Sequence, residues 1–290
     1  MPDHNDHLPE LPSLDEEIER HYSQGQEQQR LRRDTGEMER LRTADILYRY
    51  LPSPPAVIYD VGGAAGIYAF PLAEKGYHVH LIDPAPLHIE QAQAHSAQSG
   101  IPLASIARGD ARALNISSGV ADAVLLLGPL YHLVKKSDRM AALHEAKRIL
   151  KPGGILFAAA ISRFASFIDG LSNGYFKDSQ FRALAGADLA TGRHRNPTSF
   201  PEYFTTGHFH RREELHAEIC EAAFADVKVL AVEGPAWGAA HFRAAVTDLV
   251  QRNALLEMLS EIESESSIVG ASAHFIALAR KPAGPFQNGF

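Results

Sequence analysis

The chain has 290 residues, of which 45% are hydrophobic and 22% are charged. A chain of this length and composition can bury a substantial core, so we expect a globular protein with one large domain and an elaboration. Its 28 basic and 35 acidic side chains give a formal net charge of -7, with no long run of Lys or Arg. This balance argues against nucleic acid as the partner. It does not exclude nucleic acid, because an acidic protein can still carry a basic groove.

The cysteine count and the lengths of the apolar runs indicate the cellular compartment. Cys220 stands alone, which excludes an intrachain disulfide and a zinc cluster made of cysteines. The first seven residues lack the positive start and the apolar stretch of a secretory signal. The longest apolar runs, such as 155–161, are far shorter than the roughly 20 residues that cross a bilayer. We therefore expect a cytoplasmic protein with no membrane segment.

The chain opens with a polar segment. Residues 1–13 are rich in His, Pro and Asp and predict a disordered leader. Residues 14–51 carry apolar side chains at helical spacing, which predicts two helices that form an N-terminal lid. Asp34 and Glu37 have capping-box spacing for the second helix, and Pro52 begins the stretch that ends it.

Residues 52–161 alternate short apolar runs with helical stretches, which indicates repeated βαβ units and a parallel sheet. The predicted strands are 57–61, 78–82, 105–107, 123–127 and 155–160, and the predicted helices lie near 66–75, 85–98 and 138–150. Pro71 would lie inside the first of these helices, where it predicts a kink. This segment is the expected cofactor-binding core.

The rhythm breaks at residues 162–212, which are rich in glycine and aromatic residues and predict an inserted cap. Residues 213–282 then complete the core, with helices at 213–223 and 242–260 and strands at 227–232 and 274–279, before a tail at 283–290. The long helical excursion allows the final strand to pair antiparallel at the sheet edge. The predicted fold class is α/β, with a doubly wound, mostly parallel seven-stranded sheet, N-terminal helices and an inserted cap.

A glycine-rich loop at 60–66 follows the first predicted strand directly. Such a turn lets backbone approach a ligand closely and aims helix N–H groups at it. The dinucleotide fingerprint G-x-G-x-x-G, counted from Gly62, needs glycines where Ala64 and Ile67 stand. The pattern therefore fails for a dinucleotide, and a tight turn without a cofactor remains the alternative.

The loop resembles motif I of the class I S-adenosylmethionine-dependent methyltransferases, D-x-G-x-G-x-G. Asp60, Gly62 and Gly66 match it, and Ala64 replaces the middle glycine. The resemblance implies a Rossmann-like methyltransferase fold with S-adenosylmethionine as the cofactor. It also implies that these four residues and Gly63 line the cofactor.

Three further segments fit the same family in the same order. Asp83, followed by Pro84, ends the second predicted strand, where the resemblance implies a carboxylate that accepts both ribose hydroxyls. Asp110 and Ala111 follow the third strand, where the family places a carboxylate facing the adenine amino group. Residues 148–154, Arg-Ile-Leu-Lys-Pro-Gly-Gly, resemble the family's signature before the fifth strand, whose role is mainly structural.

The methyl acceptor is expected after the fourth strand. Ligands of open α/β sheets bind beyond the carboxyl ends of the strands, which places Leu127 beside the cofactor and residues 128–132 beside the acceptor. His132 is the candidate base, since an imidazole can take a proton near neutral pH, or it merely caps the strand end. Tyr131 shapes the pocket or fills the core. Tyr22 covers the cofactor, as an N-terminal helix does in many small-molecule methyltransferases, or only docks its helix.

Candidate substrate residues lie in the cap and near the C-terminus. They are His194, Tyr203, His208 and Trp237, which suit a flat or apolar acceptor. His208 and His210 would point the same way on a strand, but no third ligand is apparent, so no metal is expected.

The leading hypothesis is methyl transfer from S-adenosylmethionine to an oxygen or nitrogen of a small molecule. The chain lacks the Asn/Asp-Pro-Pro-Tyr pattern of many amino-group methylases of DNA and protein, which favours a small acceptor. The alternatives are an RNA or protein methylase, a non-catalytic S-adenosylmethionine-binding subunit and a nicotinamide oxidoreductase. The oligomeric state is left open.

Overall fold

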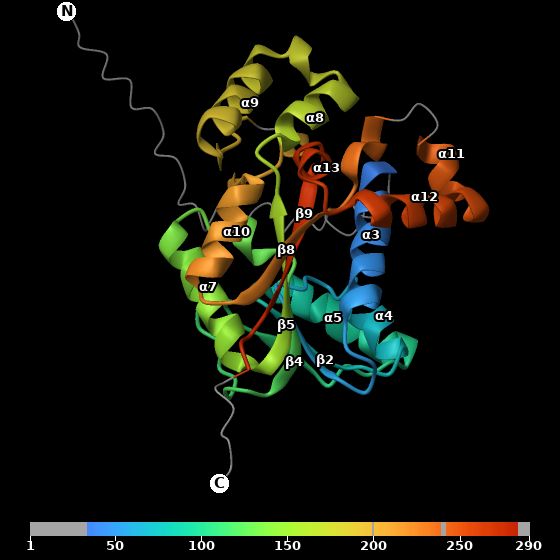
Figure 1. Ribbon diagram of the computed structural model, residues 1–290, viewed down its shortest axis with the longest axis vertical. Coiled ribbons are helices and arrows are strands. Elements are labelled where there is room, and N and C mark those ends of the chain that lie inside the picture. Colours follow the sequence, from blue (N-terminus) through green and yellow to red (C-terminus); the bar gives the residue numbers. More distant parts are fainter. Residues whose placement is uncertain (1–33, 199, 239–241, 284–290) are drawn as a thin grey trace, which may run out of the picture.

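The computed structural model describes residues 34–198, 200–238 and 242–283, and Figure 1 labels its elements. Tyr22, the predicted leader and the first predicted helix lie outside the described residues. None of the helices in the described ranges has the length and apolar character that a membrane span needs.

Seven strands form the main sheet, in the order β3-β2-β1-β4-β5-β9-β8. The five strands from β3 to β5 are parallel, and β9 runs antiparallel to both of its neighbours. The bounds are β1 (Val57–Val61), β2 (His78–Asp83), β3 (Ser105–Arg108), β4 (Ala121–Leu126), β5 (Leu150–Ile161), β8 (Ala225–Ala231) and β9 (His274–Arg280). The predicted fold class, a mostly parallel seven-stranded α/β sheet, is confirmed.

The place of the final strand differs from the prediction. β9 pairs antiparallel as expected, but it lies between β5 and β8, so β8 forms the edge. The reason is burial: β9 is buried over Phe275–Ala279, whereas the first half of β8 alternates with exposed residues. A strand with both faces buried needs a neighbouring strand on each side to pair its backbone N–H and C=O groups. A half-exposed strand can lie at the edge of the sheet, where water reaches those groups.

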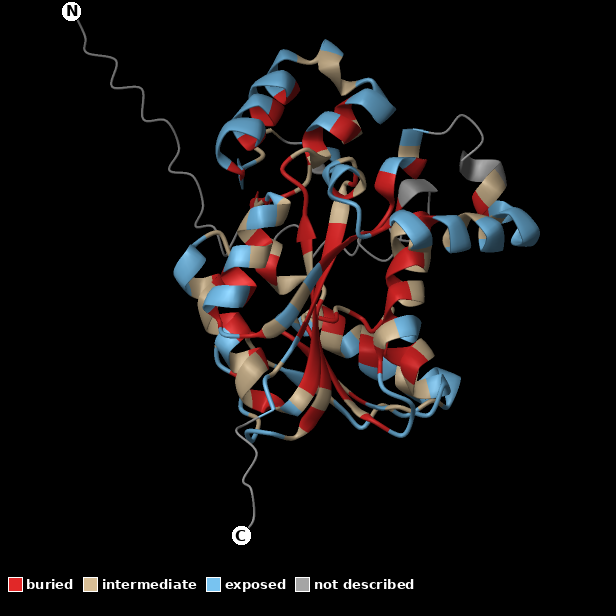
Figure 2. Ribbon diagram, viewed as in Figure 1, coloured by how far each residue is buried: buried red, intermediate tan, exposed pale blue. Residues whose placement is uncertain are grey.

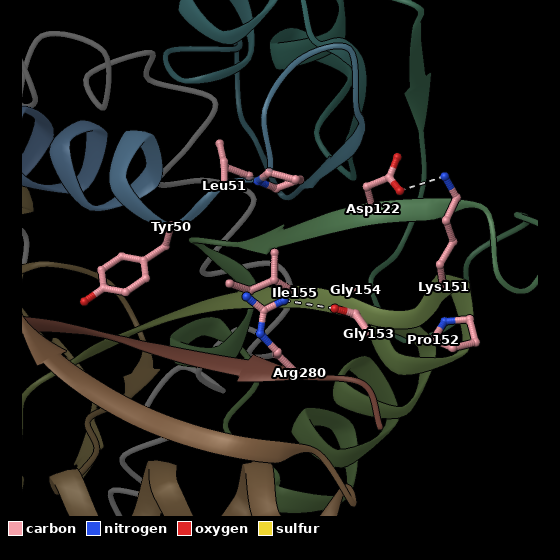
Figure 3. A pocket seen from close by; sticks show the side chains of 10 residues that line it. Tyr50, Leu51, Asp122, Lys151, Pro152, Gly153, Gly154, Ile155 and Arg280 are labelled. Atoms are coloured by element: carbon pink, nitrogen blue, oxygen red, sulfur yellow. Dashed lines mark hydrogen bonds and ion pairs between the residues drawn. The ribbon is translucent and has the colours of Figure 1, made fainter. Parts of the chain in front are cut away.

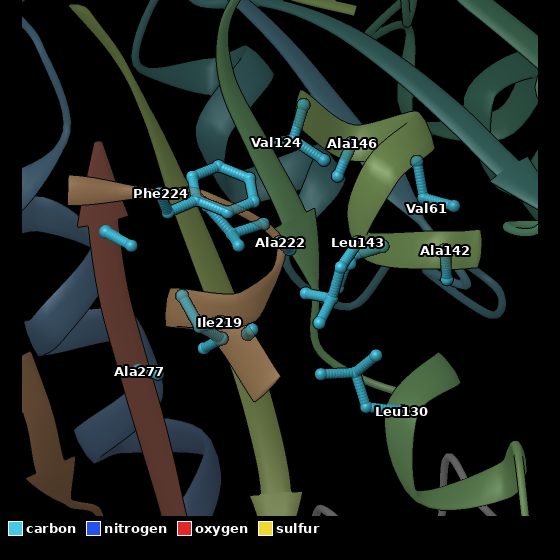
Figure 4. Close-up of a cluster of buried hydrophobic side chains, with 14 of the residues drawn as sticks. Val61, Val124, Leu130, Ala142, Leu143, Ala146, Ile219, Ala222, Phe224 and Ala277 are labelled. Atoms are coloured by element: carbon cyan, nitrogen blue, oxygen red, sulfur yellow. The ribbon is translucent and has the colours of Figure 1, made fainter. Parts of the chain in front are cut away.

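Helices cover both faces of the sheet, and Figure 2 shows their inward sides buried and their outward sides exposed. On one face α7 and α10 pack with side chains such as Val124, and Figure 4 shows this cluster. On the other face α3, α4 and α5 pack on Ala123 and Leu125. Successive residues of a strand point to opposite faces, so β4 is buried from both sides. The bounds are α3 (Asp34–Tyr50), α4 (Ala69–Glu74), α5 (Pro86–Ser99), α6 (Pro129–His132), α7 (Lys136–Ile149), α10 (Arg212–Glu221), η3 (Gly234–Gly238), α11 (Phe242–Thr247), α12 (Leu249–Ile262) and α13 (Ser266–Gly270).

Two helices differ from their predicted extents. α4 begins only at Ala69, so Pro71 lies in its first turn, where a missing N–H costs no helical hydrogen bond. The predicted kink inside a longer helix is therefore wrong. The predicted helix 242–260 is divided into α11 and α12, because the Asp248 side chain accepts the backbone N–H of Gln251 and starts a new helix.

Residues 162–212 leave the main sheet beyond the carboxyl end of β5 and return to it at α10 (Figure 1). They form a small core of their own around Phe181, Leu184 and Tyr203. Their elements are α8 (Ala165–Asn173), η1 (Tyr175–Lys177), α9 (Ser179–Thr191), β6 (Arg193–His194), η2 (Pro201–Tyr203) and β7 (Gly207–His208).

Candidate active site

The glycine-rich loop turns sharply at the carboxyl end of β1. Gly62, Ala64 and Gly66 have φ values of 71°, 49° and 90°. Side chains disfavour this left-handed region, which explains two glycines and makes Ala64 a strained position. The Gly62 N–H donates to the Ile82 carbonyl at 2.7 Å, which ties the loop to β2. We call residues 60–66 the donor loop.

Asp60 lies at the base of the donor loop and is completely buried. Neither of its carboxylate oxygens has a hydrogen-bond partner in the described part of the chain. Burial, together with the nearby charge of Asp83, raises the pKa of Asp60 to about 7. Buried polar groups are nearly always hydrogen-bonded, so an uncompensated carboxyl beside a ligand loop fits a ligand that carries positive charge. S-adenosylmethionine, with its sulfonium and ammonium groups, meets that requirement.

Asp83 lies at the end of β2 with only 6% of its side chain exposed. Its carboxylate accepts the backbone N–H groups of Ala64 and Ala85, each at 2.9 Å, and contacts His88 Nδ1 at 2.9 Å. A carboxylate offers about four lone-pair sites, so about one is left for a ligand. Asp83 therefore holds the donor loop in place, and its contact with the ribose stays a prediction.

The other predicted cofactor residues line the same rim. The Gly109 N–H donates to the Asp83 carbonyl at 3.1 Å, which brings the start of the Asp110 turn to the end of β2. Asp110 is half-exposed, and hydrogen bonds from Arg112 hold the pKa of its carboxyl below the usual range. Pro84 is exposed, Leu127 is half-buried and Ala111 is buried. The contacts of Pro84, Leu127 and Ala111 with the cofactor stay predictions.

The segment after β4 lies directly against the donor loop. A Cβ atom at Gly62 would lie 2.6 Å from Pro129 Cγ, and one at Gly128 would lie 3.1 Å from the Gly62 carbonyl oxygen. A side chain at Gly62 would clash with Pro129, and one at Gly128 would be tight, so glycine at these positions allows the close approach of α6. The predicted donor and acceptor sides of the site therefore meet through backbone contact.

An aromatic group surrounds α6. The Tyr131 and His132 rings lie 4.6 Å apart, and Phe204 lies 5.8 Å from His132 in a stacked arrangement. Phe204 has φ 65°, a left-handed conformation that is rare for a bulky residue and typical of functional sites. We call Tyr131, His132 and Phe204 the acceptor corner. Sequence reasoning missed Phe204, because nothing in its neighbourhood predicts that it reaches α6 from 72 positions away.

His194 and Tyr203 lie inside the 162–212 segment. His194 is 2% exposed, with Nδ1 2.8 Å from Asp188 Oδ2 and Nε2 2.8 Å from the Tyr203 carbonyl oxygen. The Tyr203 hydroxyl donates to Asp178 at 2.8 Å. These contacts stabilise the segment itself, and a role for either side chain at the substrate stays a prediction.

His208 and Trp237 belong to different parts of the chain. β7 packs on α6, which brings His208 close to the acceptor corner. Trp237 belongs to η3, beyond β8, and its indole N–H donates to the Ala271 carbonyl at 2.9 Å. The structure thus brings His208 next to α6, and a role for Trp237 at the substrate stays a prediction.

A cavity of about 370 Å³ is lined by residues of the central strands β4, β5 and β9, at the strand ends away from the donor loop (Figure 3). Its lining includes Asp122, Lys151 and Arg280, and Asp122 pairs with Lys151 at 2.7 Å. The Val57 N–H at the start of β1 also donates to Asp122, so this cavity adjoins the amino ends of the strands. Since ligands of open α/β sheets bind at the carboxyl ends, we place the active site at the donor loop instead.

Comparison with known proteins fits this geometry. A family model described as a methyltransferase domain matches residues 58–154. Two ubiquinone biosynthesis O-methyltransferases are similar over part of the chain: that of Methylobacterium nodulans is 37% identical over 116 residues, and that of Xylella fastidiosa is 32% identical over 119 residues. The matches cover 40% and 41% of this chain and 45% and 47% of those proteins, so the chain spans about half the length of these relatives.

Solved structures share the fold over most of the chain. An S-adenosylmethionine-dependent methyltransferase of Methanosarcina mazei has a TM-score of 0.55 at 18% identity, covering 82% of this chain and 97% of that one. A possible histamine N-methyltransferase of Thermotoga maritima has a TM-score of 0.56 at 19% identity, covering 93% and 100%. At these identities the likeness shows the fold alone. Residues 58–154 are thus similar to a methyltransferase domain, within a chain that has the fold of S-adenosylmethionine-dependent methyltransferases.

Proposed function

We propose that this chain is an enzyme that transfers a methyl group from S-adenosylmethionine to a hydroxyl oxygen of a small, flat molecule. The observation that carries the proposal is the backbone contact between the donor loop and α6, which holds a methyl donor site beside the acceptor corner. The likeness of the same segment to O-methyltransferases supports oxygen as the accepting atom.

The donor loop binds and orients the methyl donor. When bound, S-adenosylmethionine supplies a methyl group that is already activated on a sulfonium. Asp60 provides a buried carboxyl for the positive charge, and Asp83 fixes the loop backbone through the Ala64 N–H. Holding donor and acceptor in line can supply most of the acceleration of such a displacement.

The acceptor corner must remove a proton from the acceptor. Transfer to a hydroxyl oxygen forms a carbon–oxygen bond and releases the hydroxyl proton. His132 is the imidazole in the acceptor corner, and we assign it as the base that takes this proton. The Tyr131 and Phe204 rings beside it provide a surface on which a flat aromatic acceptor can pack.

The protein's charge favours a small acceptor over RNA. The formal net charge is -7, and no run of basic side chains could track a phosphate backbone. RNA or protein methylation is the outcome to exclude in the test.

The test is a methylation assay with the full chain. Purified protein is incubated with S-adenosylmethionine and parallel sets of phenols, catechols and amines, and products are identified by mass spectrometry. We expect singly O-methylated products from hydroxyl acceptors. Products from amines alone, or from added RNA alone, would refute the oxygen assignment, and no product from any set would refute the proposed activity.

His132→Ala tests the base. Removing a positioned base slows the reaction by about 100-fold or more, whereas S-adenosylhomocysteine affinity should be unchanged. His216→Ala, a histidine on α10, serves as the matched control and should keep full activity. A fully active His132→Ala enzyme would remove His132 from the reaction.

A further inference from the structure

Three metal-ligating side chains meet where the 162–212 segment returns to the main domain. They are His208 at the end of β7, His210 two residues later and Glu218 in α10, and one potential ligand atom from each lies within 4.8 Å of the others. Sequence spacing paired the two histidines but offered no third ligand. The fold supplies Glu218, because α10 turns back across the end of β7.

The group is buried and incompletely hydrogen-bonded. His210 is 0% exposed and Glu218 is 5% exposed. The Nδ1 atom of His210 is buried with no hydrogen-bond partner, and His208 forms no hydrogen bond to any described residue. The His208 ring is thus available to an exogenous ligand such as an ion, and His210 would bind that ion through Nε2, the nitrogen that lies beside Glu218.

The geometry is close to that of a metal site. His210 Nε2 and Glu218 Oε2 lie 3.3 Å apart. Ligands bound at 2.0–2.2 Å to a tetrahedral ion lie about 3.3 to 3.6 Å from one another, so this pair has the required separation. The His208 and His210 rings have centroids 4.5 Å apart and are nearly perpendicular at 89°, so they do not stack on each other.

Arg139 is the charged neighbour that any ligand here must tolerate. Its guanidinium donates to Glu218 Oε1 at 2.6 Å and to Oε2 at 2.9 Å, and also to the carbonyl oxygens of Leu133 and Val134. A carboxylate has about four lone-pair sites, and ligating carboxylates are commonly held by a second hydrogen-bonded residue. The positive charge lowers the affinity for any cation, whereas the two imidazoles favour a transition metal over Mg²⁺ or Ca²⁺.

We propose that His208, His210 and Glu218 bind one divalent transition metal ion, with Zn²⁺ as the best match. Two histidines and one carboxylate form a common zinc ligand set that leaves a fourth position open. The site adjoins α6, since a Cβ atom at Gly207 would lie 2.8 Å from the Tyr131 carbonyl oxygen. The inference concerns metal binding alone and does not depend on methyl transfer.

The test uses the full chain after treatment with a chelator. Zinc chloride is titrated in competition with a chromophoric zinc chelator, and bound metal is counted by mass spectrometry after dialysis. We expect one equivalent of zinc for the wild type and an affinity at least about 10-fold lower for His210→Ala. His208→Ala gives the same readout at a less buried position if His210→Ala does not fold, as judged by circular dichroism.

The matched control addresses the other zinc ligands on α10. Cys220 Sγ lies 3.6 Å from His216 Nδ1 on the surface of that helix, a pair that can take up zinc by itself. Cys220→Ser should therefore keep the equivalent of zinc. Binding that is lost in Cys220→Ser but kept in both histidine variants would overturn the proposal, as would a wild-type chain that binds no zinc.

Discussion

The donor loop and the acceptor corner touch each other but are built in different ways. The donor loop is seven consecutive residues whose backbone is held by left-handed turns and by hydrogen bonds to β2. The acceptor corner consists of side chains from two segments, α6 and the loop that carries Phe204. A locally determined backbone site suits a ligand that never changes, whereas a site assembled from distant side chains can change with the acceptor. Variants in the donor loop should therefore alter stability and cofactor affinity, and variants in the corner should alter selectivity.

The largest effect is expected at Asp60, the buried carboxyl of the donor loop. Because its folded pKa of about 7 lies above the ordinary value of 3.8, the folded state keeps a proton that the unfolded chain loses. Stability from this group is complete below about pH 4 and falls as the pH rises through 7. Asp60→Asn removes that loss, so its unfolding free energy relative to wild type should rise by on the order of 4 kcal/mol between pH 4 and pH 8.

Denaturant unfolding of both proteins without cofactor at the two pH values measures this difference. Parallel curves for Asp60→Asn and wild type would show that the buried carboxyl is not uncompensated.

The next effect is expected at Gly62, which joins the two sides. Gly62→Ala combines a left-handed φ of 71° with a methyl group 2.6 Å from Pro129 Cγ. We expect a loss of about 3 kcal/mol in unfolding free energy and a loss of S-adenosylhomocysteine binding. Gly119→Ala is the matched control, with φ 70° and no atom within 4 Å, and should cost only about 1–2 kcal/mol. Equal losses in the two variants would mean that the loop does not press on α6.

The third effect is expected at Asp83, which holds the donor loop and is the predicted ribose contact. Asp83→Ala should weaken S-adenosylhomocysteine binding by about 1.5–3 kcal/mol, the range for hydrogen bonds to a charged group, as measured by calorimetry. Asp122→Ala removes a carboxylate that likewise accepts a backbone N–H and pairs with a basic side chain, but at the amino ends of the strands. It should lower stability without changing affinity. An unchanged affinity in Asp83→Ala would refute its place at the cofactor.

The smallest effect is expected at Ala64, which stands where the family motif has a glycine. Its φ of 49° is strained for alanine, so Ala64→Gly relieves strain but adds entropy to the unfolded chain. The two terms nearly cancel, so we expect the free energy of unfolding, measured by thermal unfolding, to rise by at most about 1 kcal/mol. Cofactor affinity should be retained. A clear loss of stability would mean that the Ala64 methyl group packs favourably in the loop.

Much of the fold could be predicted from the sequence because its signals are local. Apolar runs such as Val57–Val61 and the Pro-Gly-Gly turn before the buried part of β5 predict a parallel sheet without knowledge of distant contacts. The donor loop was predicted for the same reason, since its glycines and Asp60 lie within seven residues.

The rest depended on contacts between distant segments. The insertion of β9 between β5 and β8 follows from how both of its faces are covered, which its own sequence does not reveal. Phe204 joins the acceptor corner through a left-handed turn at a non-glycine residue, and Glu218 reaches His210 from α10. These placements exist only after the sheet has formed.

The central claim is that the donor loop binds S-adenosylmethionine, and a calorimetric titration of the full chain with S-adenosylhomocysteine tests it most directly. We predict saturable heat with one site per chain, which is lost in Gly62→Ala and kept in Gly119→Ala. No heat with the folded wild-type chain, or equal binding by both glycine variants, would contradict the account.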